Sequence, residues 1–338
     1  FIAGHWVEGT GSIKNINPSD TADVISEYTS ATGEQFEQAV ESAIIAQKEW
    51  EEVGIEKKSQ ILIRIGDELI QKSEELGELL SQEEGKPLAE GIGEVARAGQ
   101  QFQYYGSECL RLYGEKIPST RPGFQVEISR EPLGVVGIIS PWNFPIAIPA
   151  WKAAPAMMCG NAVILKPASL TIGSAVALTE IISKQDIPKG LFNLVLGSGS
   201  DVGHKIAVHP EIAAISFTGS VQTGRQLYKD ASSTMKKMQM EMGSKNPLII
   251  MDDADLKTAI TCAVNGAYGG TGQKCTASSR LIVHENIYKK FIDGLVENIK
   301  NLKVGHALDE GTQMGPVSSQ SQFESNLKYV DIGKGEAK

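Results

Sequence analysis

Several features that define special classes of protein are missing from this sequence. No apolar stretch approaches the roughly 18 uninterrupted residues of a membrane-spanning helix. Lys and Arg are scattered singly, and the formal net charge is −9. A chain that is acidic overall and has no basic run is a poor match for nucleic acid or for an anionic bilayer. We therefore expect neither as a partner.

Cysteine and histidine are also sparse, with four and five residues of each type. They are widely spaced and lack the spacings of disulfide frameworks or zinc sites, so we expect no metal and a reducing environment. The segment Phe1–Trp6 lacks the basic and then apolar pattern of a secretion signal. These signals predict a cytoplasmic protein. The chain also lacks an initiator Met, so residues are expected upstream.

The first third of the chain reads as helices. Thr32 and Gln35 form a capping box ahead of a helix over residues 36–51. Apolar residues at helical spacing predict a second helix over 57–82, and Pro87 is placed to open a third that runs to about Tyr113. With 338 residues and ordinary globular composition, two or three domains are expected.

The pattern then changes to strands. Apolar and polar residues alternate over Gly123–Arg130, as in a half-exposed strand. Short apolar runs follow, each ahead of a turn or helix pattern: Gly134–Ile139, Ala162–Leu165, Leu191–Leu196, Ala213–Phe217 and Pro247–Met251. This alternation predicts an α/β fold with a doubly wound, Rossmann-like parallel sheet, in which ligands bind at the carboxyl ends of the strands.

Cys275 is the most informative residue. Cys159 and Cys262 lie in apolar segments and read as structural, whereas Cys275 follows two glycine-rich turns in a polar segment that we expect to be a loop tip. Glycines let backbone N–H groups approach a bound atom closely, as stabilisation of an oxyanion requires. Cys275 is therefore a candidate nucleophile.

Polar side chains follow three of the predicted strands. Asn143, held between Pro141 and Pro145, suits an oxyanion donor, although it could instead cap the next helix. Lys166 is either solvated or bonded to a ribose or phosphate. Thr218–Ser220 precede a helix, whose N-terminus suits phosphate.

Glu241 stands among methionines. Partial burial would raise its pKa towards that of a general base, while the alternative is an ion pair with Lys245 or Lys274. The glycines of Gly197–Gly203 could lie beside a nucleotide, but their spacing is not that of a dinucleotide fingerprint.

Five motifs in register resemble the aldehyde dehydrogenase superfamily over essentially the whole chain, namely Pro141–Pro145, Lys166–Ser169, Phe217–Ser220, Glu241–Gly243 and Gly272–Cys275. The resemblance implies that Cys275 attacks an aldehyde, that Asn143 and the Cys275 N–H hold the oxyanion, and that Glu241 activates water. It implies NAD or NADP as cofactor. The residues expected to bind it are Ser140, Pro141, Trp142, Lys166, Ala168, Ser169, Gly199, Gly203, Phe217, Thr218, Gly219, Ser220 and Met242.

The resemblance also implies a division into domains. Residues 1–114 and 134–241 would form the nucleotide-binding domain, 115–133 an oligomerisation strand segment, and 242–338 an incomplete catalytic domain. Relatives continue well beyond Lys338, with a further motif that holds the nicotinamide ribose. We expect a homodimer or homotetramer of the full-length protein.

Two positions bear on cofactor and substrate. NAD-preferring relatives commonly carry a glutamate where Ser169 stands, so this neutral residue predicts that NADP is accepted. The segments Asn143–Lys152 and Cys275–Arg280 look most like 2-oxoglutarate semialdehyde (2,5-dioxovalerate) dehydrogenases. Succinate-semialdehyde dehydrogenases often have an arginine where Trp151 sits, which weakens that alternative. Ser244 departs from the family, which usually has glycine there.

Two other hypotheses compete with dehydrogenation. The chain could bind nucleotide without oxidising an aldehyde, as a truncated fragment would. It could also be a thioesterase or acyltransferase that uses Cys275, Asn143 and Glu241 without hydride transfer. Lys166 and Thr218–Ser220 argue against the latter, because a hydrolase needs no nucleotide site.

Overall fold

The computed structural model describes residues 1–336, and a five-stranded parallel sheet lies at its centre. The strand order is β7-β6-β5-β8-β9. The strands are β5 (Val135–Ile139), β6 (Ala162–Lys166), β7 (Phe192–Leu194), β8 (Ile212–Gly219) and β9 (Lys237–Met242). All residues of β5, β6 and β7 are buried, which explains their continuous apolar sequences. The predicted α/β fold is confirmed.

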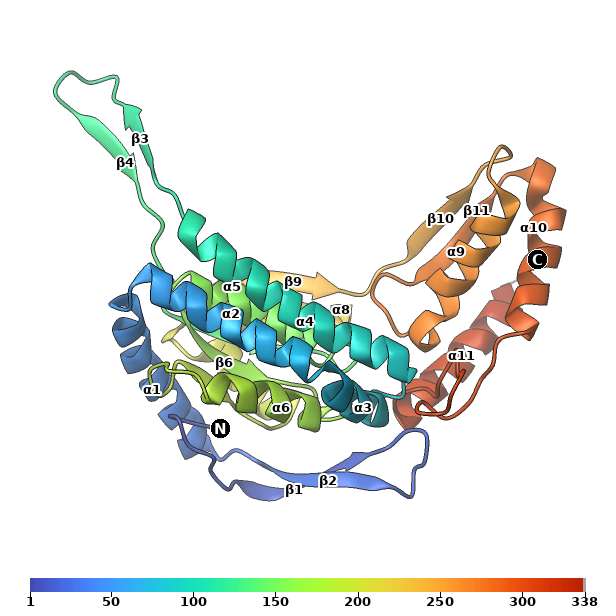
Figure 1. The fold of residues 1–338 in the computed structure, drawn as a ribbon, viewed down its shortest axis with the longest axis horizontal. Helices are drawn as coiled ribbons and strands as arrows, with labels where there is room; N and C mark the ends of the chain where they lie inside the picture. The colour runs from blue at the N-terminus through green and yellow to red at the C-terminus, as the bar shows by residue number, and fades with distance from the viewer. Residues whose placement is uncertain (337–338) are drawn as a thin grey trace.

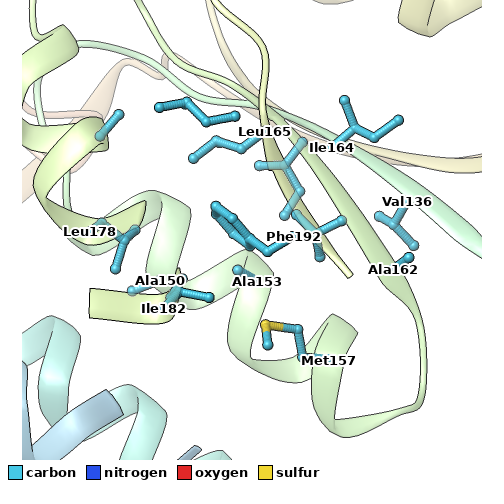
Figure 2. Packing of buried hydrophobic residues seen from close by; sticks show 14 of the residues in the cluster. Val136, Ala150, Ala153, Met157, Ala162, Ile164, Leu165, Leu178, Ile182 and Phe192 are labelled. Carbon is cyan, nitrogen blue, oxygen red and sulfur yellow. The ribbon is translucent and has the colours of Figure 1, made fainter. Parts of the chain in front are cut away.

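Helices connect successive strands of this sheet. They are α5 (Ala147–Met158), α6 (Ile172–Ser183), α7 (His204–Val208) and α8 (Val221–Ala231), with a π-helical turn over Gly199–Gly203 ahead of α7. Figure 2 shows Phe192 of β7 among side chains of α5, α6 and β6, including Ala153, Ile182 and Leu165. Burying a side chain of this size stabilises the fold by about 2–3 kcal/mol. The strand ends are therefore held by a packed core.

The helices of the first third largely match the prediction. They are α1 (Gly33–Glu51), α2 (Ile55–Gln71), α3 (Ser73–Glu84) and α4 (Leu88–Glu108), followed by a 3₁₀ turn over Cys109–Arg111. Both hydrogen bonds of the Thr32–Gln35 capping box are present. The single predicted helix over 57–82 is wrong, because the chain breaks at Lys72. No Gly or Pro marks the break; the separate directions let α3 pack against both α4 and α6. No helix in residues 1–336 is long and apolar enough to cross a bilayer.

Two antiparallel hairpins extend from the body. The first, β1 (Thr10–Ile16) with β2 (Val24–Ser30), was not predicted, because β1 is largely exposed, β2 is mostly half-buried, and neither has a continuous apolar sequence. The second, β3 (Glu115–Pro118) with β4 (Gln125–Ile128), projects away from the helices (Figure 1). β4 matches the predicted strand over 123–130, but all four of its residues are exposed rather than half of them. Its role in oligomerisation stays a prediction.

A second, smaller unit follows β9 and has its own core. It contains β10 (Asn246–Ile250) parallel to β11 (Ser278–Val283), with α9 (Leu256–Tyr268) and α10 (Glu285–Lys300). The last helix, α11 (Gln320–Glu336), has no buried residue and lies outside this core. Placing Pro247–Met251 in the main sheet was therefore wrong. The fifth strand there is β9, in which Met238, Met240 and Met242 alternate with polar residues at an edge position. The domain limits proposed from the sequence stay a prediction.

Candidate active site

The candidate site lies where the strand order changes direction. From β5 the chain adds β6 and β7 on one side and then returns to place β8 on the other. Ligands of such sheets bind in the crevice beyond the carboxyl ends of the strands at this switch point. Asn143 lies in the loop after β5, and Thr218, Gly219 and the following Ser220 lie at the carboxyl end of β8, so the topology brings two of the predicted motifs to one edge.

The Asn143 side chain is bonded to the loop that carries Cys275. Asn143 Nδ2 donates to the Gln273 carbonyl at 2.8 Å. The next helix, α5, begins at Ala147 and has no side-chain cap, so the alternative role of Asn143 as a helix cap is wrong. One N–H of the amide remains available for another acceptor.

The Cys275 loop has an unusual backbone. Gly270, Thr271 and Gly272 have φ of 58°, 58° and 67°, in the left-handed region that favours glycine. Thr271 is therefore strained by about 1 kcal/mol or more. Cys275 is exposed, as expected of a loop tip, and its carbonyl accepts from Asn246 Nδ2 at 2.7 Å.

Exposure alone does not single out Cys275. Cys159 and Cys262 are exposed as well, although their apolar sequence neighbours predicted buried, structural thiols. Cys159 comes directly after α5 and Cys262 lies within α9, and in both places the neighbours rather than the thiol face the core. Cys109 is the buried cysteine.

Two cavities meet at Cys275. The first has a volume of about 360 Å³ and is lined by Pro141–Asn143, Thr218–Ser220, Met242 and the Thr271–Cys275 loop, among others. The second, of about 400 Å³, is lined by Trp151, Lys152, Glu241 and Cys275, among others. Cys275 thus faces the strand edge proposed for the nucleotide on one side and the proposed base on the other.

Glu241 lies near the end of β9, paired in register with Thr218 of β8. The Glu241 side chain is exposed, so the partial burial expected from the sequence is not found. β9 lies at the edge of the sheet, where no further strand of this sheet covers it. The Glu241 carboxylate accepts from Gln239 Nε2 at 2.9 Å. The proposed ion pair with Lys274 is wrong, because Lys274 Nζ pairs with Glu90 at 2.9 Å.

Lys152 lines the second cavity together with Glu241 and Cys275, and it was not named from the sequence as a candidate site residue. Its Nζ donates to Ser216 Oγ at 2.7 Å and to Gln239 Oε1 at 2.9 Å. Burial lowers the pKa of this ammonium from 10.5 to about 8, and the nearby Glu241 carboxylate acts in the opposite direction. A lone lysine within the apolar α5 sequence was the available signal.

Lys166 is buried rather than solvated. The residue is 5% exposed, and within residues 1–336 its Nζ donates only to the adjacent Pro167 carbonyl, at 2.8 Å. Burial lowers the pKa of Lys166 to about 8. Ser140 lies at the end of the neighbouring strand, and its Oγ is buried without a hydrogen-bond partner in the described chain. Both groups are buried, and like Lys166, Ser140 lines neither of the cavities at Cys275.

The helix after β8 begins with a side-chain cap. Ser220 is the N-cap of α8, and its Oγ accepts from the Thr223 N–H at 3.1 Å. Phe217 is 2% exposed and supports the loop from below: a Cβ added at Gly219 would lie 2.5 Å from its ring. Gly199 and Gly203 border open space, and Ser169 is exposed. Lys166, Ala168, Ser169 and the two glycines line neither of the cavities at Cys275.

Comparison with known proteins decides the family. The model of the aldehyde dehydrogenase family matches residues 6–338. The chain belongs to the aldehyde dehydrogenase family. The resemblance drawn from the five motifs is thus confirmed.

Curated members of the family include semialdehyde dehydrogenases. The chain is 40% identical to an alpha-ketoglutaric semialdehyde dehydrogenase of Bacillus subtilis (strain 168), over 99% of this chain and 69% of the relative. It is 38% identical to a 2,5-dioxopentanoate dehydrogenase of Saccharolobus solfataricus, over 98% and 70% of the two chains.

A solved structure shows the same fold. A variant of betaine aldehyde dehydrogenase from Staphylococcus aureus, in complex with NAD+, superimposes with a TM-score of 0.97 and 34% identity. The match covers all of this chain and 69% of that one.

Proposed function

We propose that this protein oxidises a semialdehyde to a carboxylic acid with NAD or NADP, and that 2-oxoglutarate semialdehyde is the substrate. The observation that carries the proposal is the position of Cys275, which lines both cavities. The residues of the first cavity suit a nucleotide and those of the second suit proton transfer. A thiol between two such sites fits a reaction with a covalent step and a redox step.

The first step is nucleophilic attack. The Cys275 thiolate forms a bond to the aldehyde carbon, and the carbonyl electron pair moves to oxygen, giving a thiohemiacetal. The free N–H of the Asn143 amide and the Cys275 backbone N–H would hold this oxyanion. The thiolate, rather than the thiol, is the nucleophile in this step.

The strand edge fits a nicotinamide nucleotide. Ser140 Oγ is buried without a partner, and Lys166 is a buried ammonium without a carboxylate, so both have unused capacity to bond ribose or phosphate. The α8 N-terminus suits a phosphate group. When bound, the nucleotide supplies a hydride acceptor, so that the thiohemiacetal carbon is oxidised to a thioester on Cys275.

Hydrolysis of the thioester completes the reaction. Glu241 would take a proton from water, whose oxygen attacks the acyl carbon; the carbon–sulfur bond breaks and Cys275 leaves as thiolate. Exposure of Glu241 lets water reach its carboxylate. Lys152 lines the same cavity, where the Glu241 carboxylate raises the pKa of its ammonium against the lowering by burial.

Ser169 supports acceptance of NADP. It lies three residues after Lys166, is neutral and is exposed, so no carboxylate at this position repels a 2′-phosphate. The two curated relatives support the semialdehyde substrate, and Trp151 in the second cavity leaves no arginine there to select succinate semialdehyde.

The test combines two readouts on purified protein. 2-Oxoglutarate semialdehyde is mixed with NADP or NAD while the absorbance of reduced nicotinamide is followed, and Cys275→Ala serves as the inactive control. We expect reduction that depends on aldehyde and on Cys275. Hydrolysis of a thioester or ester by Cys275 with no reduced nucleotide would favour a thiol hydrolase. Nucleotide binding without either activity would contradict both enzymes.

A further inference from the structure

The first two turns of α4 contact both loops of the candidate site. Glu90 and Glu94 lie four residues apart on this helix, and residues at that spacing share a face. Neither belongs to a motif that the proposed chemistry uses. Each glutamate instead contacts a different loop, so α4 connects the two.

Glu90 contacts the loop that carries Cys275. One of its carboxylate oxygens accepts from the Gly270 N–H at 2.9 Å, and the other pairs with Lys274 Nζ at 2.9 Å. Gly270 begins the left-handed run of the backbone, and Lys274 directly precedes Cys275. Glu90 therefore binds both ends of the strained turn. A strained turn persists only when its surroundings hold it in place.

Glu94 contacts the loop that carries Asn143, partly through Lys86. One Glu94 oxygen accepts from the N–H groups of Ile146 and Ala147, both at 3.1 Å, where α5 begins. The other accepts from Lys86 Nζ at 2.7 Å. Lys86 Nζ also donates to the Asn143 carbonyl at 2.7 Å, so the backbone on both sides of Phe144 is held.

These groups are deeply buried. Lys86 is 2% exposed and Glu94 5% exposed, and the ammonium also lies 4.2 Å from the Phe144 ring centroid. The neighbouring Glu84 accepts from the Lys86 N–H at 2.9 Å, and burial raises the pKa of its carboxyl to about 8. Lys86 Nζ lies 2.7 Å from Glu94 and 3.9 Å from Glu84, so Glu94 is the closer of its two carboxyl partners. Buried pairs of this kind are weak evidence for stability and better evidence for a specified geometry.

We propose that Glu90 and the Lys86–Glu94 pair are positioning residues that hold the Cys275 loop and the Asn143 loop in register, and so set the place of the oxyanion. The inference rests on the proposed roles of Cys275 and Asn143. The Asn143 amide already bonds Gln273 of the facing loop, so a shift of either loop moves the donor relative to the thiol. Misplacement by about 1 Å at a reacting centre can reduce the rate about 100-fold.

A double-mutant cycle on kcat tests whether Lys86 acts through Asn143. Lys86→Met is made in the wild-type protein and in Asn143→Ala. We expect kcat to fall about 10- to 100-fold in the wild-type background and less than threefold in Asn143→Ala, with the KM for aldehyde changed less than threefold in both. An equal loss in both backgrounds would overturn the proposal, because Lys86 would then act independently of Asn143. Lys184→Met, which removes the exposed pair with Glu68, is the matched control and should change nothing.

Two further measurements distinguish the contacts of Glu90 with the Cys275 loop from those of Glu94 with the Asn143 loop. They also distinguish both effects from general unfolding. Alkylation of Cys275 by iodoacetamide, followed by peptide mass spectrometry to exclude Cys159 and Cys262, should change more than threefold in Glu90→Gln but not in Lys86→Met. Amide hydrogen exchange over residues 144–147 should accelerate at least tenfold in the isosteric Glu94→Gln and not in Glu90→Gln. Equal responses of both regions to both variants would refute the inference that Glu90 and Glu94 hold different loops.

Failure of the proposed function would look different. If Asn143→Ala kept full activity, the oxyanion role would be wrong, yet hydrogen exchange in Glu94→Gln would still report whether the pair holds the loop.

Discussion

Lys166→Met should stabilise the fold and weaken the proposed nucleotide site at the same time. Lys166 is a buried ammonium at the end of β6, and its one hydrogen bond in the described chain goes to the adjacent Pro167 carbonyl. Burial lowers its pKa from 10.5 to about 8. That difference corresponds to about 3 kcal/mol of unfavourable free energy for the charged form at neutral pH. Met has similar length and no charge, and it loses a hydrogen bond of about 1 kcal/mol. The net expected gain is about 1–3 kcal/mol.

The pH dependence of this effect has a definite sign. Because the pKa of Lys166 is lower in the folded state, the unfolded chain binds more protons between pH 8 and 10.5. The free energy of unfolding of the wild type therefore rises with pH across this range, and below pH 8 the full penalty remains. Lys166→Met lacks this contribution, so its advantage should be largest at pH 7 and should shrink as the pH approaches 10.5.

Urea unfolding at about pH 7 and about pH 9.5, followed by tryptophan fluorescence, measures the stability. Equilibrium binding of NADP measures the affinity of the proposed nucleotide site. Loss of a charge-assisted bond there should raise the Kd for NADP about 10- to 100-fold. Lys236→Met is the matched control: burial also lowers the pKa of Lys236 to about 8, but this residue precedes β9 at the opposite edge of the sheet, so NADP binding should not change. A Lys166→Met protein that is less stable at pH 7, or that binds NADP normally, would refute the reasoning.

Three further outcomes follow from the site. Asn143→Ala should lower kcat about 100- to 1000-fold, while iodoacetamide still alkylates Cys275 at a rate within threefold of wild type. Ser169→Glu should lower kcat/KM for NADP by about tenfold or more, a 1.4 kcal/mol effect, and leave NAD nearly unaffected; a wild type that prefers NAD more than about tenfold would contradict the role of Ser169. Glu241→Gln should form one equivalent of reduced nucleotide in a burst and then turn over slowly, because the thioester is no longer hydrolysed; a slow first turnover would place Glu241 in another step.

The sequence predicted the sheet well because fully buried strands have a strong signal. The apolar runs of β5, β6 and β8 predicted strands that the structure confirms, and the polar residues after them lie at one edge as expected. The hairpin β1–β2 and the edge strand β9 were missed because they lack a continuous apolar run: β1 is largely exposed, and β9 alternates half-buried methionines with exposed polar residues.

The groups around the site were harder to predict because their environment is set by distant segments. Glu241 has methionine neighbours in sequence, but its side chain is exposed because β9 is an edge strand. Glu90 and Glu94 look like the polar face of an ordinary helix, and only the fold shows that Gly270 and Lys86 meet them. Sequence periodicity indicates which face of a helix is polar, but not what that face contacts.

The polar groups of the site fall into two classes that should respond oppositely to substitution. Those at the strand ends make few hydrogen bonds. In the described residues, Lys166 Nζ donates only to a neighbouring carbonyl, and Ser140 Oγ has no partner. Those behind the loops make several hydrogen bonds each: the Glu94 carboxylate, for example, accepts from three donors. Removing an unpaired buried polar group relieves a penalty, whereas removing one member of a bonded set leaves its partners unsatisfied. Apolar substitutions at the strand ends should therefore preserve or raise stability while lowering ligand affinity. Those at Lys86 and Glu94 should instead lower stability and kcat, because their bonded partners are left unsatisfied and the loops are no longer held in place.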